Sequence, residues 1–339
     1  MATRRRRRQN RLYTGLIVVI LASGAATYYK VFWKPIRDAA EGAAARGGRA
    51  ALPLTSERPE GGDLTGGPYN HVPERGTDAP ASPYDQPEKT DYPRAHALMQ
   101  AGFASSQRGE IIDARAKLSE ALALRLPQEE TVRSRAALSK LADQTLFSSS
   151  ITPNDPFVSA HVIQPGETLV KIAKRLDVTA DLLAHVNNIP DKNQIRAGRR
   201  IKVLHGPFHA VINRETFDMD VYLQKTFIKH FKVGLGADGS TPSGKWKVCS
   251  KLVNPTYYPP RGGDIIAADD PENPLAERWI GLEGVEGDAV GQERYGIHGT
   301  IDPESIGKNM SLGCVRLYNE DVEFLFDLLV PEKSVVVIR

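Results

Sequence analysis

The apolar positions of the chain change their spacing along its length. Between residues 92 and 150 they fall three or four positions apart, which predicts helices with one buried face. From residue 207 onward, short apolar runs alternate with turn residues, and strands are predicted at residues 210–212, 218–223 and 226–233 and around Trp246. The C-terminal part of the chain is therefore predicted to be mainly β and the middle part helical.

One helix is predicted close to the C-terminus, between two β segments. Asn319 has the residue type of an N-cap, and Glu320 and Asp321 place negative charge in the first turn, where the helix dipole favours it. An apolar face follows and ends before Pro331, and residues 334–338 form a closing strand. We expect a curved β-sandwich that carries this helix, with a long loop from residue 254 to residue 293.

The N-terminal region differs in composition from the rest of the chain. Residues 1–11 contain five consecutive arginines, and residues 12–33 begin with an uncharged apolar stretch that is long enough to span a bilayer. Since positive flanks stay on the cytoplasmic side, we predict a basic cytoplasmic tail and a single-pass anchor in a bacterial inner membrane. The other domains would then lie in the periplasm or cell wall space. A cleavable signal peptide is the alternative, because Ser23-Gly24-Ala25 has the small residues of a processing site.

Two segments separate this region from the β-rich part. Residues 34–91 are rich in Ala, Gly, Pro and charge and show almost no apolar periodicity, which predicts a disordered linker. In residues 92–150, the chain resembles one tetratricopeptide (TPR) unit in the spacing of Leu98, Gly109, Ala114, Leu118 and Ala121. Because stacked repeats need several copies, a helical spacer or packing module is favoured over a binding site for a protein partner.

A compact unit is predicted at residues 160–205. It opens with a strand at residues 161–163, continues through a Pro165-Gly166 turn and two short helices, and closes with a strand at residues 200–203. This order is similar to that of a LysM domain of βααβ form, a module that binds glycans containing N-acetylglucosamine. The resemblance implies two glycan-binding loops, which contain Gly166, Glu167, Thr168 and Leu169, and Ile189 and Pro190. The alternative for each residue is a structural role in a turn or in the core.

Two short segments near the C-terminus place a thiol and an imidazole beside glycine. His298 lies in Tyr295-Gly296-Ile297-His298-Gly299-Thr300, and Cys314 lies in Ser311-Leu312-Gly313-Cys314-Val315-Arg316. A free thiol is little ionised at neutral pH and needs a nearby base, so such a pair is typical of acyl transfer through a cysteine. The alternative is an inert core cysteine and a turn histidine.

The same two segments resemble the motif of the L,D-transpeptidase family, also called the YkuD domain. The likeness includes residues 234–246 and 278–282 and covers residues 207–339. It implies a mainly-β catalytic domain in which Cys314 attacks a carbonyl of a peptidoglycan stem peptide and His298 is the base. It further implies release of D-alanine, a thioester on the cysteine, and transfer to an amine of a neighbouring stem to give a 3-3 crosslink.

Other residues around the pair are candidates for orientation and binding. Gly299 and Gly313 allow close backbone approach, and the amides around Gly313 are candidates for the oxyanion site, with Ser311 as a local hydrogen-bonding partner. The family more often has a histidine where this chain has Leu312, whose main-chain carbonyl we expect to orient His298. The candidates for substrate contact are Arg316, which can bind a carboxylate, and Thr300, Tyr257 and Tyr258.

Composition narrows the set of cofactors and partners. The net charge of +3 comes largely from the N-terminal arginines, so no nucleic-acid partner is predicted. The histidines lack metal-ligand spacing, and neither a metal nor another cofactor is expected. A disulfide between Cys249 and Cys314 would consume the nucleophile, so Cys249 is predicted to be a buried thiol in the strand that contains Trp246. The predicted partners are peptidoglycan stem peptides, glycan strands and the membrane.

The leading hypothesis is a membrane-anchored L,D-transpeptidase that concentrates on glycan through its LysM domain. Three alternatives stay open on the sequence. Leu312 raises the possibility of a glycan-binding wall protein with weak or no catalysis. The same thioester also supports an L,D-carboxypeptidase or an enzyme that attaches protein to the wall. The TPR-like segment allows an adaptor that recruits other wall proteins.

Overall fold

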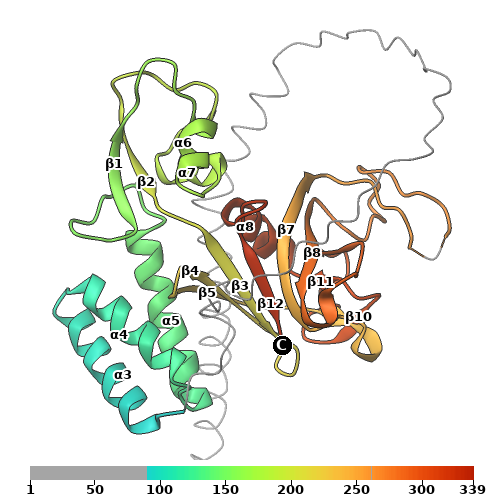
Figure 1. Ribbon diagram of the computed structural model, residues 1–339, viewed down its shortest axis with the longest axis horizontal. Coiled ribbons are helices and arrows are strands. Elements are labelled where there is room, and N and C mark those ends of the chain that lie inside the picture. The colour runs from blue at the N-terminus through green and yellow to red at the C-terminus, as the bar shows by residue number, and fades with distance from the viewer. Residues whose placement is uncertain (1–89, 261) are drawn as a thin grey trace, which may run out of the picture.

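The computed structural model describes residues 90–260 and 262–339, whose arrangement is shown in Figure 1. The predicted basic tail and membrane anchor, and the linker up to residue 89, lie outside the described residues. Within the described part, no helix is both long and apolar enough to cross a membrane. The described chain forms a helical unit, a small βααβ unit and a β-rich C-terminal unit (Figure 1).

The helical unit consists of α3 (Tyr92–Gln107), α4 (Ile111–Ala123) and α5 (Gln128–Thr145). Asp91 caps α3 by accepting a hydrogen bond from the Arg94 N–H. Helices α3 and α4 pack closely because Gly102 has no side chain; a Cβ at this position would lie 2.7 Å from Leu118 Cγ. The helical character predicted for this segment is confirmed.

The βααβ unit consists of β1 (Val158–Val162), α6 (Leu169–Arg175), α7 (Ala180–Val186) and β2 (Arg200–Leu204). The two strands pair antiparallel. Thr168 and Thr179 cap the two helices by accepting hydrogen bonds from main-chain N–H groups in the first turns. The element order is the predicted one, although the first strand begins earlier, at Val158.

The C-terminal unit is built on a curled sheet of eight strands in the order β11-β9-β8-β7-β12-β3-β4-β5 (Figure 1). The strands of this sheet are β3 (Phe208–Asn213), β4 (Asp218–Leu223), β5 (Thr226–Lys232), β7 (Gly244–Val253), β8 (Arg278–Glu286), β9 (Tyr295–His298), β11 (Val315–Arg316) and β12 (Val335–Ile338). A small parallel pair is formed by β6 (Leu235–Gly236) and β10 (Asn309–Ser311). Helix α8 (Asn319–Leu328) packs against β8 and β9, and its buried Val322 and Leu325 join the core of the sheet.

Three details of the fold predicted from the sequence are wrong. The predicted loop of residues 254–293 is interrupted by β8, so that the loop proper spans residues 254–277. Asn319 is the first residue of α8 and not its cap; Tyr318 occupies the cap position. Cys249 is exposed and not buried. Its strand contains a β-bulge, in which Val248 pairs with Leu282 and Ser250 with Gly281, so Cys249 is the extra residue and its side chain leaves the core face.

The helical unit docks on one edge of the sheet. Helix α5 packs on the edge strand β5, and the side chain of Phe227 is buried in the core of the helical unit. The guanidinium of Arg135 lies 3.3 Å from Asp218 and 2.5 Å from Asp220 on β4. These contacts fix the helices to the eight-stranded sheet, as expected of a packing module.

The βααβ unit contacts both of its neighbours. Arg115 of α4 forms a buried ion pair of 2.7 Å with Asp155, which precedes β1. On the other side, His185 of α7 lies 2.9 Å from the carboxylate of Asp327 in α8, and the Thr179 hydroxyl donates to the Asp327 carbonyl. The three units therefore share interfaces that contain ion pairs and apolar side chains.

Candidate active site

The candidate nucleophile and base lie at the edge of the sheet opposite to the helical unit. Strands β9 and β11 run parallel, with Val315 opposite Ile297 and Arg316 opposite His298. Because side chains alternate between the two faces of a strand, Ile297 and Val315 both point into the core, where they are buried. Cys314, Arg316 and His298 therefore share the other face, with the thiol and the imidazole as diagonal neighbours.

His298 is held in one orientation by two contacts. Its Nδ1 lies 2.6 Å from the carbonyl oxygen of Gly299 and donates to it, which leaves Nε2 as the nitrogen that can accept a proton. The ring of Trp279, which pairs with His298 across β8 and β9, stacks on the imidazole at 5.8 Å between centroids and 19° between planes. Burial, assisted by the charge of Arg316, lowers the pKa of His298 to about 4. The imidazole is therefore neutral at pH 7.

The carbonyl that orients His298 belongs to Gly299 and not, as predicted, to Leu312. Leu312 is 53% exposed. The chain turns after His298, so that the carbonyl oxygen of Gly299 meets the imidazole ring of His298. Asn319 stabilises this turn, because its Oδ1 accepts the Thr300 N–H at 2.8 Å. A Cβ on Gly299 would lie 2.3 Å from the same Oδ1, so this position requires glycine.

Thr300 itself is bound within its own turn. Its hydroxyl accepts the Asp302 N–H at 3.0 Å and lies 3.2 Å from the Asp302 carbonyl oxygen, to which it donates. The side chain is buried. The structure thus gives Thr300 a role in the turn that carries the Gly299 carbonyl, and its hydroxyl is already satisfied without substrate.

The turn that carries Cys314 is tied down by two hydroxyl groups. Ser311 Oγ donates to the Cys314 carbonyl at 2.6 Å and accepts the Gly313 N–H at 3.1 Å. The buried hydroxyl of Thr241 donates to the Gly313 carbonyl at 2.8 Å. Since Ser311 occupies the Gly313 N–H, the main-chain donor left for an oxyanion is the N–H of Cys314, which donates to no group among the described residues.

Gly313 is required by both its backbone conformation and its surroundings. Its φ of 134° lies in a region that L side chains rarely adopt. A Cβ there would lie 2.7 Å from Cε1 of Tyr295 and 2.9 Å from the carbonyl oxygen of Ser240. Tyr295 is held against this turn, because its hydroxyl donates to the Ser240 carbonyl at 3.1 Å.

The thiol of Cys314 is partly exposed and lies 3.7 Å from the Arg294 carbonyl oxygen. Burial raises the pKa of Cys314, while a hydrogen bond from the Gly296 backbone and the charge of Arg316 act in the opposite direction. The thiol is therefore protonated at rest. A neutral thiol beside a neutral imidazole is the starting state that a general-base mechanism needs.

Arg316 supplies positive charge beside both groups. Its backbone is fixed by two hydrogen bonds with Gly234, at 2.8 and 2.9 Å. Its Nε is buried without a hydrogen-bond partner, and within residues 90–260 and 262–339 its guanidinium forms no ion pair. Arginine presents N–H groups in a fork that matches a carboxylate, so this guanidinium is suited to an anionic substrate group.

Within the described chain, no hydrogen bond joins Tyr257 or Tyr258 to Cys314 or His298. Both lie on the loop of residues 254–277, where Tyr257 pairs through its backbone with Ile266 and Tyr258 is 68% exposed. This loop leaves β7 and returns to β8 next to Trp279, at the end of the sheet where His298 lies. The end of the loop thus lies beside the site, and a substrate contact by either tyrosine stays a prediction.

The predicted glycan-binding residues of the βααβ unit fall into two groups. Gly166, Thr168 and Pro190 are exposed. Leu169 and Ile189 are buried, and their apolar side chains pack in the core beneath the loops, which is the structural role given above as the alternative; a glycan contact at these positions stays a prediction. In each loop an exposed residue and a buried residue are adjacent in the sequence, and the sequence alone does not show which of the two can contact a glycan.

Glu167 has a structural role in the first of these loops. Its carboxylate accepts the Gln164 N–H at 2.9 Å and binds His161 and Arg175 at 2.6 and 2.5 Å. The Gln164 N–H, followed by His161 and Arg175, lowers the pKa of Glu167 to about 2. The carboxylate is therefore charged and already bound by protein groups. Within the described residues, no cluster of three or more His, Cys, Asp or Glu side chains is arranged to hold a metal ion.

Three residues that shape the site were not predicted as site residues. Trp279 stacks on the base, Asn319 supports the orienting turn, and Thr241 holds the cysteine turn. Asn319 was interpreted as a helix cap, which is a common role for its residue type. Thr241 lies in a glycine-rich turn, and its bond to Gly313 joins segments far apart in sequence, so no local pattern reveals it.

Two family models match this chain. The family model of the L,D-transpeptidase catalytic domain matches residues 207–338, and that of the LysM domain matches residues 161–204. The putative L,D-transpeptidase YqjB of Bacillus subtilis is 37% identical over 129 residues, which cover 37% of this chain and 68% of that protein. The probable L,D-transpeptidase YcfS of Escherichia coli is 29% identical over 205 residues, which cover 53% of this chain and 61% of that protein.

Among solved structures, an L,D-transpeptidase from Mycobacterium tuberculosis aligns at 15% identity with a TM-score of 0.32. The aligned part covers 42% of this chain and 63% of that chain, which is less than two thirds of its length. The sequence matches and the observed mainly-β fold agree with the resemblance found in the cysteine and histidine segments. The chain therefore belongs to the L,D-transpeptidase family, and a LysM domain precedes its YkuD-type catalytic domain.

Proposed function

We propose that this protein is a peptidoglycan L,D-transpeptidase that forms 3-3 crosslinks through a thioester on Cys314. One observation carries the proposal: the register of β9 and β11 sets Cys314, His298 and Arg316 on the same face at the edge of the sheet. This face combines a nucleophile, a neutral base with its Nδ1 already bound, and an arginine that forms no ion pair with the described residues. These are the groups that acyl transfer from a carboxylate-bearing peptide requires.

In the first half-reaction, Nε2 of His298 accepts the thiol proton as Sγ of Cys314 attacks the carbonyl carbon of the donor stem. The carbonyl electron pair moves to oxygen, where the Cys314 N–H donates to the oxyanion. When the intermediate collapses, the C–N bond breaks and the imidazolium returns its proton to the departing amine of D-alanine. The products are free D-alanine and a thioester between the stem and Cys314.

In the second half-reaction, an amine of a neighbouring stem attacks the thioester. His298 accepts a proton from this amine and returns it to the departing thiolate, so that the enzyme is regenerated with a neutral pair. Arg316 binds a substrate carboxylate and excludes misplaced stems. If water replaces the amine, the same steps trim the stem, and a protein amine in its place gives attachment of that protein to the wall.

The LysM domain would concentrate the enzyme on glycan strands, with Gly166, Thr168 and Pro190 as the exposed candidates for contact. A location outside the cytoplasm fits both wall-directed domains. We place residues 12–33 in the inner membrane as a single-pass anchor, on the grounds of their apolar run and the arginines before it.

Release of D-alanine from a disaccharide tetrapeptide tests the proposal. The native protein should release D-alanine and, with a second stem present, form the crosslinked dimer. Cys314→Ala should abolish both products, and His298→Gln should lower the rate by at least about 100-fold, since general-base assistance contributes roughly 10²–10⁴. Cys249→Ala is the matched control because it removes an exposed thiol. Equal activity of the native and Cys314→Ala proteins would remove Cys314 as the nucleophile.

A second candidate is a glycan-binding wall protein with weak or no catalysis. It is favoured by Leu312, whose exposed aliphatic side chain cannot relay a proton. Because the orienting carbonyl comes from Gly299, the substitution leaves the base in place, and for this reason we favour the active enzyme. Normal binding to isolated wall without any release of D-alanine would decide for the second candidate.

A further inference from the structure

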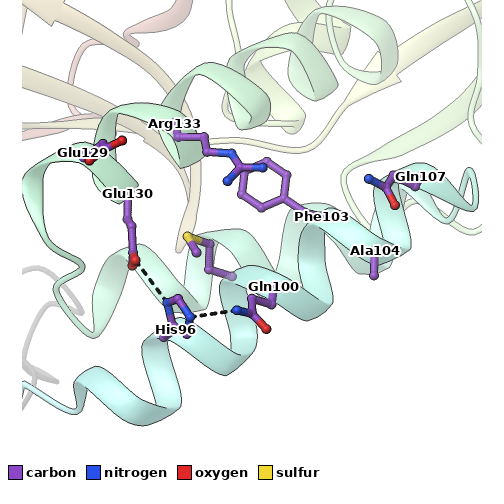
Figure 2. Close-up of a pocket in the computed structure, with 9 residues that line it drawn as sticks. His96, Gln100, Phe103, Ala104, Gln107, Glu129, Glu130 and Arg133 are labelled. Atoms are coloured by element: carbon purple, nitrogen blue, oxygen red, sulfur yellow. Dashed lines mark hydrogen bonds and ion pairs between the residues drawn. The ribbon is translucent and has the colours of Figure 1, made fainter.

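A groove of about 410 Å³ opens on the helical unit between α3 and the first turns of α5 (Figure 2). Its apolar floor contains Met99, which is buried, and Phe103, which is half-buried. Its rim carries charge from α5, with Glu129 and Glu130 in the first turn and Arg133 one turn later. The groove thus combines an apolar floor with charges of both signs.

The carboxylate of Glu130 is only partly satisfied. As Figure 2 shows, it points toward His96, whose Nδ1 lies 3.1 Å from Oε1; the Tyr92 hydroxyl donates to the same oxygen at 3.4 Å. Oε2 is buried and has no hydrogen-bond partner among the described residues. The side chain as a whole is 23% exposed and lines the groove, so its negative charge is open to a ligand that brings N–H donors. Glu129 adds negative charge on the same rim.

Arg133 offers the opposite charge across the floor. Its guanidinium carbon lies 4.3 Å from the centroid of the Phe103 ring, and Figure 2 shows it stacked there. Stacking uses the face of the guanidinium and leaves its N–H edge available, and in the described part of the chain Arg133 forms no ion pair. Because Glu130 and Arg133 are three positions apart on one helix, both charges face the same groove.

From this arrangement we infer that the groove binds a wall stem peptide with a free side-chain amine. The ammonium group of the peptide would bind Glu130, and the methylene groups of the same side chain would pack on Phe103 and Met99. A carboxylate of the peptide would pair with Arg133. This inference rests on the proposed function, because a wall enzyme meets such peptides on every strand that is not yet crosslinked. It assigns a binding role to the helical unit in addition to its packing role.

The peptide in the groove is not the peptide that is acylated. The helical unit packs on β5, whereas Cys314 lies beside β11, and these strands form the two opposite edges of the eight-stranded sheet. The groove is lined by residues of α3 and α5 alone, none of which belongs to the segments that carry Cys314, His298 and Arg316. The groove therefore provides a second attachment to the wall, on a stem other than the donor.

Calorimetric titration of the full chain tests this assignment. The Cys314→Ala protein prevents turnover, and the probes are a tetrapeptide stem with a free side-chain amine and the same peptide with this amine acetylated. We expect acetylation to raise the Kd at least tenfold. Glu130→Gln should raise the Kd of the amine peptide by a similar factor and leave that of the acetylated peptide unchanged. Glu120→Gln is the matched control, since it removes an exposed carboxylate of the same unit outside the groove lining.

An unchanged Kd for the amine peptide in Glu130→Gln would overturn the inference, as would equal binding of the amine and acetylated peptides. Phe103→Leu keeps the floor apolar and should weaken binding severalfold through loss of the ring under Arg133, which gives a second variant. An unrelated lysine-containing tetrapeptide that binds as tightly as the stem would overturn the assignment to wall peptides. Acylation of Cys314 in the otherwise native Glu130→Gln protein is measured separately, so failure of the groove and failure of the proposed chemistry are distinguishable.

Discussion

At the scale of single residues, the base is positioned by a short series of contacts that begins outside the cysteine motif. Asn319 Oδ1 accepts the Thr300 N–H, and the turn that this bond stabilises directs the Gly299 carbonyl to Nδ1 of His298. Trp279 covers the ring from the neighbouring strand. The orientation of the base thus depends on groups that do not touch the substrate.

Asn319→Ala should therefore lower kcat with little change in KM. Loss of the side-chain oxygen frees the Thr300 N–H and allows the Gly299 carbonyl to leave the imidazole, so we expect roughly a tenfold loss of kcat, as for other groups that orient a reacting residue. Steady-state release of D-alanine measures it. Asn193→Ala, on an exposed loop of the LysM domain, is the control. A change in KM alone would show that Asn319 acts on substrate binding and not on the base.

The pH dependence of kcat/KM should have its acidic limb near pH 4, because the pKa of His298 is lowered to about 4. Below this value the imidazolium cannot accept the thiol proton, so activity falls. Burial is the main cause of the low pKa and the charge of Arg316 lowers it further, so Arg316→Gln should move the limb upward. Lys308→Gln, which removes an exposed charge, should leave the limb in place. A limb near the ordinary value of about 6.5 in the native protein would contradict burial of the base.

At the scale of elements, the turn before β11 decides where the thiol lies. Ser311 and Thr241 bind it from two sides, and Gly313 adopts a φ of 134° against the ring of Tyr295. This turn joins β10 to β11, so its geometry also fixes the register of β11 on β9. A small shift here would separate the thiol from the imidazole.

Gly313→Ala tests the turn. The new Cβ would lie 2.7 Å from Tyr295 Cε1, so the turn must move, and we expect activity to fall by at least about 100-fold because misplacement of reacting groups by about 1 Å has this effect. Gly291→Ala is the matched control: its φ of 79° imposes backbone strain, but nothing lies within 4 Å of the added Cβ. It should lose about 1 kcal/mol of stability and keep its activity. Comparable loss of activity in both variants would show that strain, and not crowding at the cysteine, is responsible.

Elements with regular apolar spacing were predictable from the sequence, and those set by distant neighbours were not. The apolar positions of α8 and of β3 to β5 follow the expected periods. Strand β8 contains Gly281 and Gly284, and glycine weakens the pattern from which a strand is predicted. The glycine at 284 is required by a distant neighbour, since a Cβ there would lie 1.8 Å from the Ala289 carbonyl oxygen. Likewise, the bulge that exposes Cys249 and the carbonyl that orients His298 arise from pairings across the fold. The motif residues could be found in the sequence, and the groups that orient them could not.

At the scale of the whole molecule, an ion pair that joins two units is buried, whereas an ion pair within the LysM unit is exposed. Arg115 and Asp155, at 2.7 Å, are almost completely buried where the helical and LysM units meet, whereas Lys192 and Asp181, at 2.6 Å, are exposed. Removal of one partner from a buried pair leaves an uncompensated charge, while an exposed pair contributes little. The buried pair is therefore the sensitive point of this interface.

Arg115→Met should lower the free energy of unfolding by about 3–5 kcal/mol, because Asp155 would stay buried without its guanidinium partner. Lys192→Met should change it by less than about 1 kcal/mol. Urea denaturation followed by circular dichroism measures both. If the two variants were equally stable, the interface between the helical and LysM units would not be the buried contact described above.

The central claim is that Cys314, the diagonal neighbour of His298 at the start of β11, becomes the acyl carrier. Intact mass and peptide mapping after incubation with a donor tetrapeptide test it most directly, since Cys249 is an exposed thiol that serves as an internal control. We predict an adduct with the mass of the donor less D-alanine, mapped to Cys314 and absent from Cys314→Ala. An adduct on Cys249, or release of D-alanine without any adduct at Cys314, would contradict the account.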